Sequence, residues 1–209
     1  MPAFSQPPTG RQPFSIPLFP LRTVLFPGGV LPLKIFEQRY IEMAKDCLRE
    51  MRPFGVCLIT RGEEVATPEA APPEITSIGT LATIASWEMP QLGILHVGTE
   101  GGLRFQVHKH SVASSGLVVG TVATLAAETP VALPERHAPL AKLLELIAAR
   151  VGAANFPVEK RYDDASWVGY RLAELLPLPL SIKQSMLEIN DAGVRLDVLS
   201  QFLAKQGLI

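Results

Sequence analysis

The hydrophobic pattern of this chain changes its period once, near Thr129. Before that residue, apolar positions alternate or run in short blocks, which is typical of β-strands. After it, apolar residues recur every three or four positions, the spacing that places them on one face of an α-helix. The pattern therefore predicts an α+β fold with a flexible polar tail over 1–12, strands over 13–127 and a helical bundle over 128–209.

The start of the strand region is rich in proline. Residues 14–36 read FSIPLFPLRTVLFPGGVLPLKIF and hold four prolines, which exclude a helix there. The residues between the prolines favour strands, and Pro27-Gly28-Gly29 is a turn signal. We expect two or three short strands whose prolines lie at sheet edges or bulges.

One helix is predicted inside the strand region, over residues 37–52. Its apolar residues follow the i, i+4, i+7, i+8, i+11 stripe of one helix face, and Pro53 ends it. The stripe consists of Tyr40, Ala44, Cys47, Leu48 and Met51. A buried strand over 54–60 and a polar loop over 61–74 follow.

The rest of the strand region predicts a small barrel or sandwich, because several short strands follow one another at near-regular spacing. The Gly101-Gly102 pair is assigned to a hairpin turn between two of them. The expected strands cover 75–87, 92–100, 102–111 and 116–125.

Capping residues predict where the last three of four helices begin in the second half. Asp163 is expected to cap the second helix and Asp191 the fourth. Ser181 and Gln184 have the spacing of a capping box for the third.

Composition narrows the class of protein. Apolar residues make up 47% of the 209 residues and charged residues 19%, which excludes disorder as the main state. The net charge of −1 argues against a general binder of polyanions. No secretory signal and no apolar stretch of membrane-spanning length is visible, so we expect a soluble cytoplasmic chain with no membrane partner.

A search for catalytic, cofactor and metal motifs finds none. The sequence lacks a phosphate-binding P-loop, a G-x-S-x-G nucleophile elbow and an H-E-x-x-H zinc motif. Cys47 and Cys57 lie in apolar runs and are expected to be buried thiols rather than a reactive pair. His108 and His110 share one strand face, which is expected to be an exposed polar face rather than a metal site. We expect no enzymatic activity, no cofactor and no metal.

The best candidate for nucleic-acid contact is the basic and aromatic cluster over 104–110. Strand alternation places Arg104, His108 and His110 on one face and Phe105 on the other. The aromatic ring is then not beside the bases, as a stacking platform requires. Nucleic acid is not expected as a partner, and an RNA-binding module is kept as the alternative function.

One predicted hairpin tip is apolar where tips are normally polar. The segment ASWEMPQLGIL, residues 85–95, places Trp87, Met89, Pro90 and Leu92 at or near that tip. In one interpretation they form an exposed patch that binds other apolar chains, and methionine suits a surface that accepts many shapes. In the other, the tip folds onto the helical half and is buried.

Residues 16–48, IPLFPLRTVLFPGGVLPLKIFEQRYIEMAKDCL, strongly resemble the start of the substrate-binding domain of Lon proteases. In that family (L/I)PLFPL, VLFPG and LPLxIFExRY recur in this order and spacing. Shorter matches follow at 52–59, 78–84 and 102–107, and residues 176–203 resemble the helical end of the family's domain. The resemblance implies a PUA-like β-barrel with one inserted helix, followed by a helical bundle.

The resemblance also implies a function. The domain is implicated in recognising unfolded or damaged polypeptides, so we expect a polypeptide-binding module that acts beside a protease or a chaperone. A full Lon protease continues into an ATPase module and a Ser-Lys peptidase domain, and neither is expected here. The oligomeric state stays open. The family's signature residues are expected to be mainly structural, with the two phenylalanines in the barrel core: Pro20, Phe26, Pro27, Gly28, Phe36, Glu37, Arg39 and Tyr40.

Overall fold

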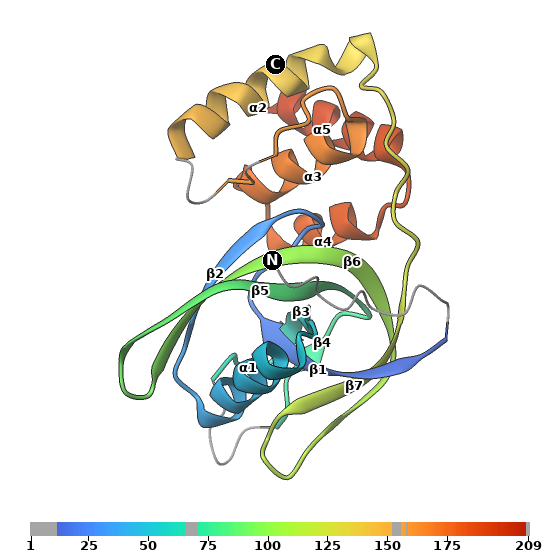
Figure 1. Ribbon diagram of the computed structural model, residues 1–209. Coiled ribbons are helices and arrows are strands. Elements are labelled where there is room, and N and C mark those ends of the chain that lie inside the picture. The colour runs from blue at the N-terminus through green and yellow to red at the C-terminus, as the bar shows by residue number, and fades with distance from the viewer. Residues whose placement is uncertain (1–11, 66–70, 152–155, 158, 208–209) are drawn as a thin grey trace. The chain divides into compact units, whose positions relative to one another are not determined.

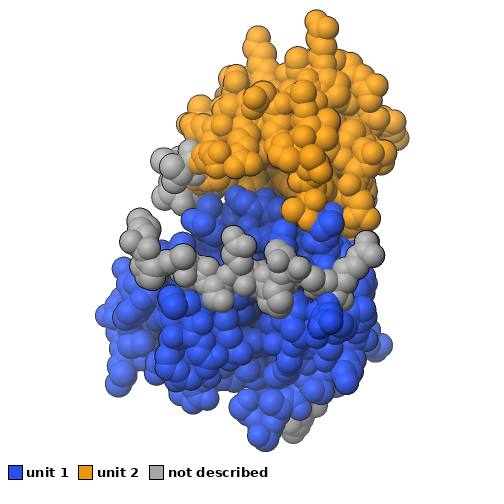
Figure 2. All heavy atoms as spheres, turned by 45° about the vertical axis from the view of Figure 1, so that its right-hand side comes forward, with its two compact units in different colours: residues 1–126 blue, residues 127–209 orange. Residues whose placement is uncertain are grey.

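The computed structural model describes residues 12–65, 71–151, 156–157 and 159–207, so almost all of the predicted tail over 1–12 lies outside them (Figure 1). The chain divides into two compact units, residues 1–126 and 127–209 (Figure 2). Within the described residues, every strand lies in unit 1 together with one α-helix, and unit 2 is helical. The predicted α+β class is confirmed.

Five strands of unit 1 close into a ring. β1 (Phe14–Leu21) pairs with β7 (Val118–Thr124), and β7 pairs with β6 (Ile94–Val112). β6 pairs with β5 (Ile78–Gln91), and β5 with β3 (Phe54–Arg61). All four pairings are antiparallel, and a parallel pairing of β3 with β1 completes the ring. These five strands therefore form a small closed barrel, in which each strand has a neighbour on both sides.

Two further strands lie outside the ring. β4 (Glu74–Ile75) pairs with β3, and β2 (Val30–Ile35) pairs with residues 95–100 of β6. Because β5 lies along the other edge of β6, the strands here follow the order β2, β6, β5. In Figure 1 this part ends in the long β5–β6 hairpin at the lower left. We call residues 30–35, 85–91 and 94–100 the hairpin sheet.

The predicted turn at Gly101-Gly102 is wrong, because β6 continues through both residues. Gly101 is instead a point of close approach to the Pro27-Gly28-Gly29 turn. The N–H of Gly28 donates to the Gly101 carbonyl over 2.7 Å, and the N–H of Gly101 donates to the Gly29 carbonyl over 2.8 Å. A Cβ on Gly101 would lie 2.2 Å from the carbonyl oxygen of Phe26. Glycine is required there by the neighbouring backbone and not by a turn.

The predicted helix inside the strand region is α1 (Gln38–Glu50). Tyr40 and Cys47 lie on its buried face, and the ring of Tyr40 stacks on Phe19 of β1 at 4.0 Å between centroids. Met51 was expected on the buried face but is 40% exposed. It takes the left-handed conformation with φ 50° and ends the helix before Pro53.

Both cysteines are buried and free, as predicted. Cys47 packs in the cluster around α1, whereas Cys57 of β3 packs in a second cluster. Burial raises the pKa of Cys47 to about 11 and that of Cys57 to about 12. Neither thiol is therefore a reactive thiolate at neutral pH.

The described residues of unit 2 form four α-helices after a short 3-10 turn, and none of the described helices is long and apolar enough to cross a membrane. The third α-helix begins after Pro179, with Ser181 already inside it, so the predicted capping box does not form. The elements are η1 (Glu135–His137), α2 (Ala138–Val151), α3 (Ala165–Leu175), α4 (Leu180–Glu188) and α5 (Ala192–Lys205).

Two aspartates cap helices in unit 2. Asp191 caps α5 as predicted, accepting from the backbone N–H three residues later over 2.9 Å. Asp164, and not Asp163, caps α3, accepting from the N–H of Ser166 over 2.8 Å. The helix begins one residue later than expected because the carbonyl of Asp163 accepts from the N–H of Leu133 and is held in that pairing.

Candidate functional site

The predicted apolar tip lies at the end of the β5–β6 hairpin. Leu92 and Gly93 form its turn, and Gly93 takes a positive φ of 84°. The side chains of Trp87, Met89 and Leu92 are 59%, 40% and 95% exposed, and Pro90 is exposed as well. Within the described residues of unit 1, these side chains are therefore not buried. We call these four side chains the tip patch.

β5 has two parts with different surroundings. Residues 79–82 lie in the barrel wall and are buried, whereas all seven residues from 85 to 91 are exposed. The β5–β6 register shifts between Ile84 and Ser86 and again between Glu88 and Gln91, where β5 holds extra residues. Such bulges bend a strand and increase its twist. The second part of β5 thus leaves the wall and carries the tip patch into solvent.

Trp87 belongs to the inner face of the hairpin sheet. It lies opposite Val97 of β6, which in turn lies opposite Leu33 of β2. Residues directly opposite each other point to the same face. Val97 is only 3% exposed, because it packs in the cluster around α1, but Trp87 on the outer strand is 59% exposed. Trp87 therefore continues the apolar surface of the core out into solvent.

The outer face of the hairpin sheet is charged. Lys34, His96 and Glu88 occupy one register position across the three strands, and Nδ1 of His96 lies 3.2 Å from Oε1 of Glu88. Phe36, expected in the core, is 54% exposed. Its neighbour Ile35 takes the inward position at 2% exposure, and strand alternation then turns Phe36 outward.

The remaining signature residues before β2 fill the core or form the turn between β1 and β2. Phe26 is fully buried and Pro20 is buried within β1. Gly28, after Pro27, takes a positive φ of 67°, and the N–H of Gly29 closes the turn on the carbonyl of Phe26 over 2.9 Å. This turn is the one that contacts β6.

Arg39 joins the start of α1 to a turn that is distant in the sequence. Its guanidinium lies 2.9 Å from the carboxylate of Glu37, donates to the carbonyl of Gly116 over 2.7 Å and lies 4.4 Å from the centroid of the Tyr40 ring. Gly116 belongs to the turn between β6 and β7 and has a φ of 82°. These contacts fasten the start of α1 to that turn.

The basic cluster over 104–110 does not form one surface. Arg104 was expected on an exposed face with His108 and His110, but it is only 4% exposed. A register shift between Val107 and Lys109 also interrupts the alternation at His108. Among the described residues, no group of three or more His, Cys, Asp or Glu side chains has the geometry of a metal site.

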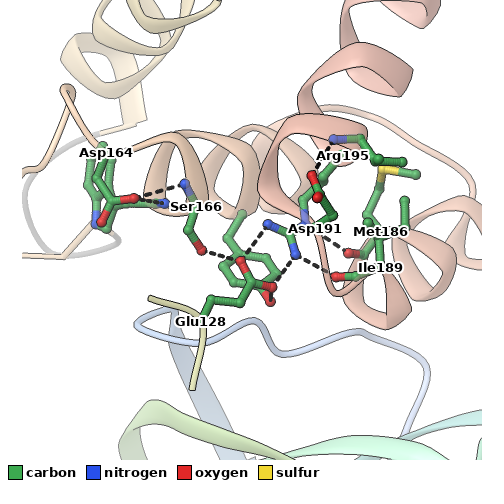
Figure 3. Close-up of polar contacts among 10 residues, drawn as sticks. Glu128, Asp164, Ser166, Met186, Ile189, Asp191 and Arg195 are labelled. Carbon is green, nitrogen blue, oxygen red and sulfur yellow. Dashed lines mark hydrogen bonds and ion pairs between the residues drawn. The ribbon is translucent and has the colours of Figure 1, made fainter. Parts of the chain in front are cut away.

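A buried charge cluster in unit 2 was not predicted from the sequence (Figure 3). The carboxylate of Glu128 accepts hydrogen bonds from the Ser166 hydroxyl, the Tyr170 hydroxyl and both terminal nitrogens of Arg195. Its donors lie 38, 42 and 67 residues further along the chain. No local motif marks such a cluster, which only the folded chain assembles.

Arg195 is the centre of this cluster. Its side chain is fully buried, donates to the carbonyls of Met186 over 3.1 Å and Ile189 over 2.6 Å, and lies 3.8 Å from the centroid of the Tyr170 ring. Burial raises the pKa of Glu128. The hydrogen bonds from its three partners and the guanidinium charge together lower the pKa by more than burial raises it, so the pKa lies below its ordinary value. Glu128 is therefore ionised at neutral pH, and both of its carboxylate oxygens accept hydrogen bonds. Such a group stabilises the fold and has no proton to donate in catalysis.

Residues 15–205 match the family model of the ATP-dependent protease La (LON) substrate-binding domain. The chain belongs to this family. Among curated relatives, Lon protease of Phenylobacterium zucineum is 28% identical over 198 residues and Lon protease 2 of Myxococcus xanthus is 27% identical over 190. The matches cover 92% and 90% of this chain but 24% and 20% of those proteins. The chain thus spans a quarter or less of the relatives' length.

Solved structures of Lon N-terminal domains show the same architecture. The Lon N-terminal domain protein from Xanthomonas campestris is 36% identical, with a TM-score of 0.73 over 91% of this chain and 98% of that one. The N-terminal domain of Mycobacterium avium complex Lon protease is 18% identical with a TM-score of 0.61, which shows the fold. The predicted membership of the family is confirmed. The match is to the substrate-binding domain and not to the ATPase or protease domain of Lon.

Proposed function

We propose that this LON-family chain is a non-enzymatic module that binds apolar segments of unfolded or damaged polypeptides through the tip patch. The observation that carries the proposal is the exposure of Trp87, Met89 and Leu92 on one hairpin. Contiguous exposed apolar side chains are typical of interaction sites. The membership of a family of substrate-binding domains supports a polypeptide as the ligand.

The size of the tip patch favours weak, reversible binding. Fully burying one Leu or Met side chain contributes about 1.5–3 kcal/mol, and Leu92 has almost all of its surface to bury. Part of this gain is offset by the loss of freedom of the bound chain. A dissociation constant in the micromolar to millimolar range follows. Weak binding suits a module that passes its client on to a protease or chaperone.

The tip patch should prefer unfolded over native polypeptides because native proteins bury the side chains that it binds. A folded protein buries most of its large apolar side chains, whereas an unfolded chain offers them in every segment. The tip patch bears no charge within its four side chains. Its affinity should therefore depend little on salt, in contrast to phosphate contacts, which weaken steeply with ionic strength.

The test compares a reduced, alkylated, unfolded polypeptide with the same polypeptide in its native form, by fluorescence anisotropy. The double variant Trp87→Ser, Met89→Ser should bind the unfolded form at least about tenfold more weakly. The matched control is Val194→Ser, Val198→Ser, which removes two exposed apolar side chains from α5 in unit 2 and should leave binding unchanged.

Three outcomes would contradict the proposal. If the double variant binds the unfolded polypeptide as tightly as the wild type does, the tip patch is not the binding site. If the wild type binds native and unfolded polypeptide with equal affinity, it does not select unfolded polypeptides. A steep loss of polypeptide binding between about 50 and 500 mM salt would indicate charge contacts in place of apolar ones, and salt-sensitive binding of a single-stranded RNA by the wild type would favour the RNA-binding alternative.

A further inference from the structure

The hairpin sheet has two outer strands with one neighbour each. β6 lies in the middle, and in the described residues β2 and the end of β5 pair only with it. An outer strand normally presents a row of unpaired N–H and C=O groups, and extended peptides bind to such edges by adding a strand. Whether these two edges can accept a strand decides how the proposed client is recognised.

The edge of β2 lacks a donor at its centre. Pro32 lies opposite Gly98 in a ladder of six register pairs without irregularity. Proline has no N–H, so an undisturbed antiparallel ladder accommodates it only where its nitrogen faces away from the partner strand. The neighbouring carbonyl of Leu31 faces β6, since it accepts from the Thr99 hydroxyl over 2.8 Å. The nitrogen of Pro32 therefore lies on the open edge.

The edge of β5 is interrupted twice. Between its two register shifts only Ser86, Trp87 and Glu88 keep regular pairing with β6. The second shift contains Pro90, which removes another N–H. Three regular residues are fewer than the five or six of a typical strand, and bulges twist an edge away from an added strand.

We propose that both edges of the hairpin sheet are closed to strand addition, so that the tip patch recognises apolar side chains and not the main chain of its client. The client is then an apolar segment of non-native polypeptide in any backbone conformation. This inference rests on the proposed function and specifies its ligand. The closed edges also keep the module from pairing with itself or with the strand-forming chains that it binds.

The first test uses a fluorescent ten-residue peptide rich in Leu and Phe. It is compared with the same sequence carrying N-methyl groups on alternate residues, and with a version in which every Leu and Phe is Ser. The full-length protein should bind the first two within about threefold of each other and lose the third. A loss of tenfold or more on N-methylation would overturn the inference and leave the proposed function standing. Failure of all three peptides to bind would overturn both.

The second test opens the edge. Pro32→Val restores the missing N–H, and Pro177→Val, an exposed proline of unit 2, is the matched control. Sedimentation velocity should show Pro32→Val forming larger species than the wild type, while the control sediments like the wild type. The N-methylated peptide should then bind Pro32→Val more weakly than the unmodified one. A Pro32→Val variant that sediments and binds like the wild type would overturn the role of Pro32.

Discussion

The tip patch of unit 1 and the Glu128 cluster of unit 2 depart from the usual distribution of side chains in opposite ways. The tip patch exposes Trp87 and Leu92, which are of types that folding normally buries. The cluster buries Arg195 and Glu128, which are of types that folding normally leaves in water. Each arrangement costs free energy unless something compensates it.

The two regions differ in where that compensation comes from. Glu128 and Arg195 find their partners within unit 2, from two hydroxyls and two backbone carbonyls as well as from each other. The tip patch finds no equivalent packing among the described residues of unit 1, and we propose that another molecule supplies it. Buried charge with complete partners therefore indicates a structural role, and exposed apolar surface indicates a binding role. The predictions below test this distinction.

The largest effect is expected for Arg195→Met. Removing the guanidinium leaves the Glu128 carboxylate buried without its counter-charge, which costs about 3–5 kcal/mol. Urea unfolding followed by Trp167, which lies in α3, measures the loss in unit 2. The double variant Arg195→Met, Glu128→Leu should recover part of it, because no charge is then left unpaired. An Arg195→Met protein as stable as the wild type would show that the cluster does not hold unit 2.

A smaller effect is expected for Glu128→Gln, about 1.5–3 kcal/mol from the loss of charge-assisted hydrogen bonds. The pKa of Glu128 is lowered on folding, so its contribution is complete above its ordinary pKa of 4.5 and is lost as pH falls through the folded value. As the pH falls below the ordinary pKa of 4.5, the wild type should lose more stability than Glu128→Gln. Parallel pH profiles of the two proteins would contradict this assignment.

The double variant Trp87→Ser, Met89→Ser should barely change stability, by about 1 kcal/mol at most, since these side chains are largely exposed. Truncating a buried Trp typically costs about 3–5 kcal/mol. Thermal unfolding measures the difference. A fall in melting temperature of the size expected for Arg195→Met would place Trp87 in the core and contradict the distinction between the two regions.

The smallest effect is expected for Glu88→Gln. The contact between Glu88 and His96 is solvent-exposed on both sides, and even exposed pairs of full charges contribute only about 0–1 kcal/mol. The change in unfolding free energy should stay below about 0.5 kcal/mol. A loss comparable with that of Glu128→Gln would show that burial is not what separates the two contacts.

Local patterns predicted the features that neighbouring residues determine. The stripe of α1, the cap at Asp191 and the apolar character of the β5–β6 tip all arise within a dozen residues of sequence. Each depends on helix periodicity, a side-chain cap or turn composition. The tip patch was therefore visible in the sequence, although its exposure was not decided there.

Features set by distant contacts were missed or misplaced. A glycine pair normally marks a turn, so the sequence predicts one at Gly101, but the backbone of Phe26 that requires this glycine lies far away in sequence. The sequence also predicts Phe36 in the core, whereas Ile35 takes the inward position. The Glu128 cluster depends on residues up to 67 positions apart, which no periodicity reveals.

The barrel is closed by its first strand, so during synthesis unit 1 cannot finish folding until its last strand has been made. Phe14 of β1 pairs with Val122 of β7, so the ring stays open until the whole unit has been made. At about 5–20 residues per second, translation leaves the β7-facing edge of β1 without its partner for on the order of ten seconds. This edge spans only the five residues from Phe14 to Leu18, which makes it a short template for pairing with other nascent chains.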